Sequence, residues 1–206
     1  MNSQPTSVSA ICEVALQETT ALCRDVSQLS TAQAQNILQR YAAAIDGNFI
    51  PCMAAAMLSV QSIYARSATQ NNLFEELSQD HPGMLKRFLA SANIQPAPAA
   101  YVAVSHAVHE VHKHTTQMNG LKNMSLVTLC EYTSSAFIPY IAALAQKCGG
   151  TNFEYTDVHG VADIEHAKQC VYGLEMESRH YDNAENSILE MKAVLMRLWA
   201  AIYEVD

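Results

Sequence analysis

Residues Ser125 to Ala145 read SLVTLCEYTSSAFIPYIAALA, and this stretch decides the fold. Apolar side chains recur on nearly every side of the helix that it predicts, and a helix of that kind lies buried among others. Pro139 lacks an N–H group, so we expect it to kink the helix and free the carbonyl of Ser135. The stretch has one charged residue, Glu131. It therefore predicts a central helix that carries one buried carboxylate.

Helical periodicity continues on both sides of this central segment. The chain has 7 Gly and 6 Pro in 206 residues, too few for the many turns of a β-sandwich or barrel. We find no linker, repeat or low-complexity tract, so residues 1–206 are expected to form a single all-α domain, a bundle of about seven or eight helices. Besides 125–145, helical patterns cover about 7–23, 31–46, 53–64, 73–81, 84–92, 100–117, 153–180 and 185–204.

Composition limits the partners and the compartment. The formal charge of −8 disfavours a nucleic-acid partner. The six cysteines form no C-x-x-C pair, as expected of reduced thiols. Residues 1–9 lack the basic and apolar regions of a signal peptide, and no apolar run is long enough to span a membrane. We expect a cytoplasmic protein without a membrane partner. The oligomeric state stays open, with a homodimer as the commonest symmetry.

The sharpest motif is His159-x-x-x-Asp163-x-x-His166. At about 100° per residue, these three side chains fall within about 60° of one another on a helix. Two imidazoles and a carboxylate on one face are typical of a site for iron or another divalent metal. The alternative is a solvated polar face, but the apolar residues Val158, Val161, Ile164 and Ala167 flank the motif. The spacing therefore favours metal binding.

Glu131 is the second candidate. An ionised carboxylate inside an apolar helix is costly unless it is paired or binds a metal. Taken singly, a buried hydrogen bond or ion pair would explain it. Because a histidine-rich helix follows in the chain, ligation of a metal is an equal alternative.

Three other groups of residues carry weaker signals. His106, Glu110 and His114 spread over about 80° of one helix face, where a solvated surface is the favoured interpretation. Glu177-x-x-His180 matches the Glu-x-x-His pattern of ferritin-like bundles, but a second such pair is missing. Residues 72–82 read NLFEELSQDHP, which alone is an ordinary acidic helix end.

Taken together, the Asn-Leu-Phe-Glu-Glu…His pattern at 72–81, Glu131, and the motif at 159–166 resemble the haem-oxygenase-like di-iron oxidase and oxygenase superfamily. This group includes proteins similar to the chlamydial protein associating with death domains and relatives with the TenA and PqqC fold. The similarity covers the chain from about Tyr41 to His180. The resemblance implies six metal ligands: Glu76, His81, Glu131, His159, Asp163 and His166.

Two of these assignments depend on local spacing. Asn72 stands four residues before Glu76, as in the family's Asn-Leu pattern, which favours Glu76 over Glu75 as the ligand. His81 follows Glu76 by five residues, which places the two side chains about 140° apart on a regular helix. The backbone must therefore leave α geometry before Pro82 if His81 is to be a ligand.

The resemblance also implies the chemistry. Three carboxylates and three neutral imidazoles would hold two Fe(II) ions per chain, with O₂ as co-substrate and an external reductant as electron donor; Mn/Fe is an open alternative to Fe/Fe. Members of the group often oxidise small amino-acid-like or other carboxylate metabolites. Such a substrate calls for a basic residue, and the candidates are Arg87, Lys168, Arg179 and Arg197.

Three alternative functions remain open at this point. A mononuclear non-haem iron enzyme would use His159, Asp163 and His166. A TenA-like metal-free hydrolase would use a reactive cysteine, for which Cys130 is the candidate. A non-catalytic interaction protein would need neither.

Overall fold

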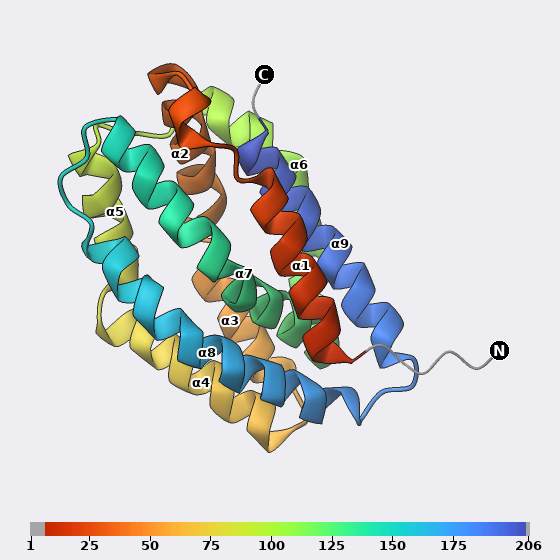
Figure 1. The fold of residues 1–206 in the computed structure, drawn as a ribbon. Helices are drawn as coiled ribbons and strands as arrows, with labels where there is room; N and C mark the ends of the chain where they lie inside the picture. Colours follow the sequence, from red (N-terminus) through yellow and green to blue (C-terminus); the bar gives the residue numbers. More distant parts are fainter. Residues whose placement is uncertain (1–6, 205–206) are drawn as a thin grey trace.

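The structure is a computed structural model, and it describes residues 7–204. Within this range the chain is all α-helical, which confirms the predicted fold class. The nine α-helices and one 3-10 turn (η1, Val26–Gln28) follow one another along a single bundle (Figure 1). The α-helices are α1 (Val8–Leu22), α2 (Thr31–Ile45), α3 (Phe49–Ser59), α4 (Ile63–Ser78), α5 (His81–Ser91), α6 (Pro98–Thr115), α7 (Gly120–Lys147), α8 (Glu154–Ser178) and α9 (Ala184–Tyr203).

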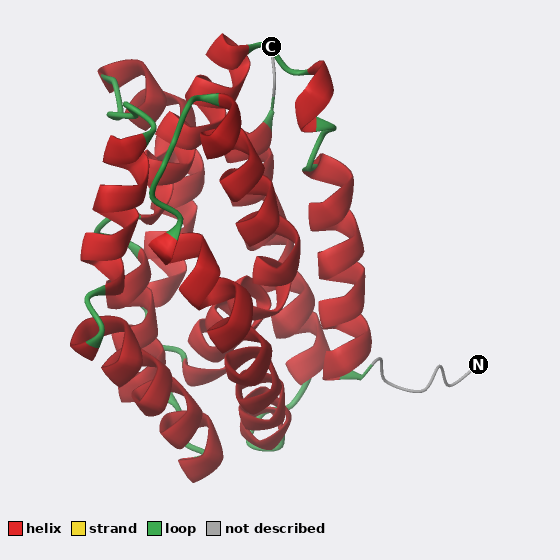
Figure 2. Ribbon diagram, turned by 60° about the vertical axis from the view of Figure 1, so that its left-hand side comes forward, coloured by secondary structure: helices red, strands yellow, loops and turns green. Residues whose placement is uncertain are grey.

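The predicted central helix is α7. It packs against α1, α2, α3, α8 and α9, and its side chains are buried along most of its length. Figure 1 shows α7 running through the bundle, with α4 and α8 together on one side and α1 and α9 on the other. Figure 2 shows from another side that the described chain consists of helices joined by loops. Helix α7 continues through Pro139. The apolar surface of α7 explains its central place in the bundle, because only contact with several helices removes all of that surface from water.

Short breaks between helices account for the helix boundaries that the sequence left uncertain. The expected helix over 53–64 is wrong at both ends, because α3 begins at Phe49 and Tyr64 belongs to α4. Residues 46–48 separate α2 from α3, and Gly47 has a φ of 78°, which glycine adopts without strain. Residues 60–62 separate α3 from α4, so the helix expected over 73–81 is wrong at its start, because α4 begins at Ile63. A further break, at Asp80, separates α4 from α5.

The break at Asp80 meets the condition that the spacing of Glu76 and His81 required. Asp80 has the left-handed conformation (φ 58°), and His81 is the first residue of α5. The Asp80 carboxylate accepts a hydrogen bond from Arg87 at 3.1 Å, and Arg87 also pairs with Glu154 of α8 at 3.2 Å. The backbone therefore turns at this point and brings His81 to the same side as Glu76.

Contrary to the expectation from the sequence, one described stretch, Thr31–Ser59, is long and apolar enough to cross a membrane, and a window within it has a mean hydropathy of 1.3. It comprises α2 and α3, with the break at residues 46–48 between them. Length and composition alone are weak support for a membrane span, because core helices of globular proteins pass the same test.

Candidate metal centre

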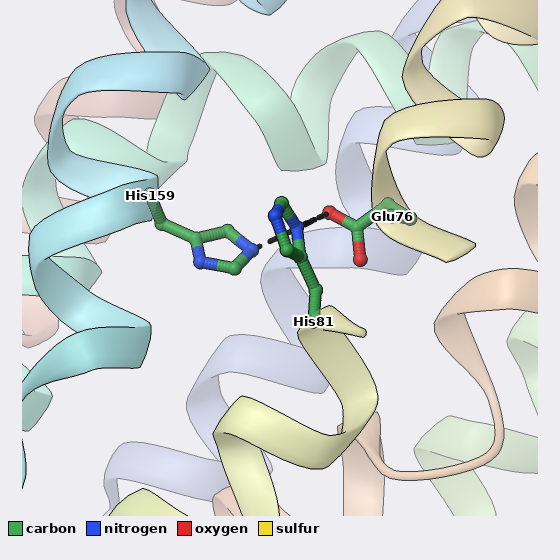
Figure 3. Close-up of side chains that lie close together, drawn as sticks. All are labelled: Glu76, His81 and His159. Carbon is green, nitrogen blue, oxygen red and sulfur yellow. Dashed lines mark hydrogen bonds and ion pairs between the residues drawn. The ribbon is translucent and has the colours of Figure 1, made fainter. Parts of the chain in front are cut away.

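Three helices bring the first group of candidate ligands together. Glu76 lies near the end of α4, His81 begins α5, and His159 lies in the first turns of α8 (Figure 3). The Glu76 Oε1 atom is 2.9 Å from His81 Nδ1 and 3.4 Å from His159 Nε2. The two imidazole rings have their centroids 4.5 Å apart. One carboxylate oxygen and two ring nitrogens thus point at a common position.

Both rings of this group are held from behind. His159 Nδ1 donates a hydrogen bond to the Tyr155 carbonyl at 2.7 Å, which leaves Nε2 facing Glu76. His81 Nε2 lies 3.3 Å from the amide oxygen of Gln79, which leaves Nδ1 facing Glu76. Metal-ligating histidines usually have such a partner on the far nitrogen. These contacts orient each ring so that its other nitrogen faces Glu76, and that nitrogen is the atom that would bind a metal ion in place of a proton.

The second group consists of Glu131 from α7 and Asp163 and His166 from α8. Their donor atoms all lie within 4.8 Å of one another. His166 Nδ1 is 3.9 Å from Glu131 Oε2 and 4.0 Å from Asp163 Oδ1, distances too long for hydrogen bonds. Nδ1 is buried and has no hydrogen-bond partner. A cation with ligand bonds of about 2 Å fits between donors at this spacing and would satisfy the orphaned nitrogen.

All six predicted ligands are therefore brought to the interior, where their exposed fractions are between 1% and 7%. The structure divides them into two groups of three, with His159 in one and Asp163 and His166 in the other. Among the described residues, the donor atoms of His159, Asp163 and His166 do not form one group of this kind. This division is unfavourable to the mononuclear alternative.

The two neighbouring glutamates of α4 face different groups. Glu76 contacts His81 and His159, whereas Glu75 lies 2.8 Å from His166 Nε2, on the far side of that ring. Sequence reasoning missed this role of Glu75.

Asn72 is also a supporting residue that sequence reasoning missed. Its side-chain N–H donates to Glu131 Oε1 at 2.8 Å, and the residue is buried. Asn72, Glu75 and Glu76 follow the i, i+3, i+4 spacing of one helix face, and this signal could have identified them together.

In the first group, the pKa of Glu76 is lowered and the pKa of His159 is raised. Burial raises the pKa of Glu76, but hydrogen bonds from His159 and His81 outweigh this effect and lower the pKa to about 2. Burial lowers the pKa of His159, yet the bond to Glu76 and the charge of Asp163 raise it overall. Glu76 is therefore an ionised carboxylate at neutral pH.

In the second group, by contrast, the pKa values of both carboxyl groups are raised. Burial, together with the nearby charge of Asp163, holds the pKa of Glu131 well above its usual range, despite the hydrogen bond from Asn72. Burial also raises the pKa of Asp163. Two buried carboxyls that share a site resist ionisation unless a cation joins them. This donor set suits a divalent metal.

The remaining candidates from the sequence lie elsewhere. On α6, His106 and His109 are exposed, and His114 is buried with its Nε2 atom 3.9 Å from Glu190. They belong to neither three-donor group found in the described residues. The exposure of His106 fits the solvated face expected for this set, but the burial of His114 does not. Glu177 accepts hydrogen bonds from the backbone N–H groups of Gln61 and Ser62. It thus holds the start of α4 and does not support a ferritin-like pair.

A large cleft between α1, α7 and α8 reaches the candidate metal centre. Its volume is about 600 Å³, and Glu131, His159 and Asp163 are part of its lining. Lys168 also lines it, and it is the only one of the four basic candidates that does so. A much smaller cavity of about 50 Å³ meets the centre beside α2 and α5, where Tyr41 and Phe137 line it.

Comparison with known proteins identifies a family. Residues 35–200 match the model of a family described as iron-containing redox enzymes. This range runs from α2 into α9 and includes all six candidate ligands. No curated protein matches the chain.

Proposed function

Because the chain belongs to the iron-containing redox enzymes of the haem-oxygenase-like group, we propose that it is a non-haem di-iron oxidase or oxygenase. One observation carries the proposal: six buried donor side chains stand in two groups of three, each containing histidine and carboxylate. Each group offers the mixed nitrogen and oxygen donors that suit iron. When bound, two Fe(II) ions would supply the binding positions and part of the electrons for the reduction of O₂, the rest coming from an external reductant.

In this proposal the residues of the chain have distinct tasks. Glu76, His81 and His159 would hold one ion, and Glu131, Asp163 and His166 the other. Gln79, the Tyr155 carbonyl and Glu75 would orient the three rings from behind. The burial of the ligands would keep bulk water from the reacting atoms.

The cleft supports a small carboxylate, such as an amino acid, as the substrate. Its volume of about 600 Å³ lies within the usual range for metabolite pockets. Much of the lining is apolar, with Leu16, Ile138 and Val171 among its residues. Lys168 is largely exposed and pairs only with its neighbour Glu165 at 3.7 Å among the interactions described. Its ammonium group would bind the carboxylate of a substrate whose other end points to the metal centre.

The TenA-like alternative has less support. Burial holds the pKa of the Cys130 thiol well above its usual range, and the charge of Glu131 raises it further. A nucleophilic cysteine needs the thiolate form near neutral pH. Cys130 therefore lacks the activation that such a hydrolase requires.

Metal analysis tests the proposed function. The chain is loaded with Fe(II) under anaerobic conditions, bound iron is counted, and the sample is then mixed with O₂ while its visible absorption is followed. We expect two iron ions per chain and a transient absorption. His166→Ala and Glu131→Ala should each lose iron, whereas His106→Ala, an exposed histidine of α6, should bind as the unmodified chain does.

The outcomes separate the candidate functions. One iron ion per chain that survives Glu131→Ala would favour a mononuclear site. Absence of iron binding, or binding unchanged in both ligand variants, would overturn the proposal and leave an interaction protein as the alternative.

A further inference from the structure

A third cavity lies between α2, α3, α6, α7 and α9, on a different side of α7 from the cleft that contains Lys168. Its volume is about 40 Å³. Leu126, Val127 and Leu195 are typical of the lining, which is almost entirely apolar. Trp199 also lines it, but its indole N–H donates to Thr133 at 3.2 Å and is therefore satisfied. The polar side chains of the lining, Asn48 and His112, are half-buried.

This cavity adjoins the small cavity at the metal centre. The two share Ile45, Phe49 and Cys130 in their linings, so they meet at the same side chains. On the other side of these residues, the small cavity is lined by Glu76 and Glu131. The two cavities are thus neighbours with a common wall, and the inner one is lined by residues of both groups of candidate ligands.

The size and polarity of the third cavity indicate which kind of molecule can occupy it. A volume of about 40 Å³ is far below that of the 600 Å³ cleft and excludes a metabolite with a charged carboxylate. Water is also disfavoured, because a water molecule held in a cavity needs two to four polar partners and this lining is almost entirely apolar. A small apolar molecule fits this volume and needs no polar partners.

We propose that the cavity between α2, α3, α6, α7 and α9 binds dioxygen on its way to the metal centre. The substrate would enter separately, through the cleft that contains Lys168. This inference rests on the proposed function for the use of O₂. The physical claim about the cavity is independent of iron, because any small apolar gas should occupy it.

Xenon is the probe that tests the cavity directly. Crystals of the unmodified protein are pressurised with xenon, and the gas is located by its scattering. We expect xenon beside Leu126 and Cys130 in the metal-free and the iron-loaded protein alike. Absence of xenon from this cavity would overturn the proposal without bearing on the di-iron function.

A pair of neighbouring alanines provides matched variants. Ala44 lines the cavity and Ala43 does not, and both are buried in α2. We expect Ala44→Leu to abolish xenon binding and to raise the KM for O₂ several-fold while the iron content stays at the unmodified level. Ala43→Leu should leave both measurements unchanged. If Ala44→Leu does not fold, Val108→Phe on α6 fills the same cavity from a half-buried position.

Each result has a distinct meaning. Loss of xenon with an unchanged KM for O₂ would show that the cavity is not the oxygen route. If the iron-loaded protein consumes no O₂ at all, the proposed function and the oxygen assignment both fail, and the xenon result still decides whether the cavity binds apolar gases.

Discussion

The carboxylate of Glu75 lies 2.8 Å from Nε2 of His166, on the side of the ring that faces away from Glu131 and Asp163. The adjacent residue, Glu76, contacts His81 and His159. One turn of α4 thus serves both groups of candidate ligands, one directly and one through a histidine ring. This relationship gives the two glutamates separate effects on metal binding.

We expect Glu75→Gln to weaken binding of the second iron ion by about 10- to 100-fold, the usual effect of removing a partner behind a metal-ligating histidine. The amide keeps the size of the side chain but removes the charge that increases the basicity of the ring. Anaerobic Fe(II) titration of Glu75→Gln measures the change. Glu165→Gln, which alters an exposed carboxylate on α8, is the control. Equal affinities in the two variants would show that Glu75 does not support the ring.

Position 80, in the break before His81, should accept asparagine without loss of stability but not valine. Asp80 has a φ of 58°, a conformation that asparagine adopts readily and β-branched residues avoid. We expect Asp80→Val to lower the free energy of unfolding by about 1–3 kcal/mol and to reduce iron bound by the first group. Asp80→Asn should retain both properties. Thermal unfolding and iron counting provide the measurements, and a fully loaded, stable Asp80→Val variant would contradict the prediction.

Asn72→Leu should destabilise the metal-free protein. Its amide donates to Glu131 Oε1 at 2.8 Å in a buried setting, so leucine leaves that oxygen without its partner. Such a loss costs about 1–3 kcal/mol of unfolding free energy. The neighbouring residue Asn71 is exposed, and Asn71→Leu is the matched control. Denaturant unfolding of the two variants should differ by this amount; identical midpoints would refute it.

Metal affinity should rise with pH. Burial raises the pKa of Glu131 and of Asp163, so the metal-free protein keeps protons on these carboxyls that a metal ion must displace. For the same reason, the contribution of Glu131 to the stability of the metal-free protein is lost as pH rises through its raised pKa.

Calorimetric titration with Mn(II), in buffers of different ionisation enthalpy, counts the protons released. We expect Glu131→Gln to release fewer protons and to show a weaker pH dependence. Proton release identical to that of the unmodified chain would contradict the assignment.

The helical fold and part of the candidate site could be predicted from the sequence by local spacing, whereas Glu76 and His81 became candidates only through the family resemblance. The apolar stretch in α7 and the helical spacing of His159, Asp163 and His166 needed no tertiary information. The division of the donors into two groups could not be predicted. It depends on the left-handed turn at Asp80, which brings His81 to Glu76, and on the packing of α4 against α8.

Residues far apart in the sequence explain the other differences. Glu177 resembled a ligand by its local spacing, yet its partners are backbone N–H groups at residues 61 and 62. The four basic candidates for substrate binding were equivalent in the sequence. Only the relative placement of α1, α7 and α8, which forms the cleft, distinguishes Lys168 from them.

Lys168→Met should impair use of a carboxylate substrate without changing the metal centre. A charge-assisted hydrogen bond contributes about 1.5–3 kcal/mol, so kcat/KM should fall by roughly tenfold to a hundredfold. The substrate is first sought by following O₂ consumption of the iron-loaded protein with a panel of amino acids and other small carboxylates.

Lys113→Met is the matched control, because Lys113 forms the same kind of pair with Glu110, at 3.7 Å and three residues away, on α6 and outside the cleft. Iron content and xenon binding should be unchanged in both variants. If Lys168→Met and Lys113→Met have the same kcat/KM as the unmodified protein for an active carboxylate, another group in the cleft binds it.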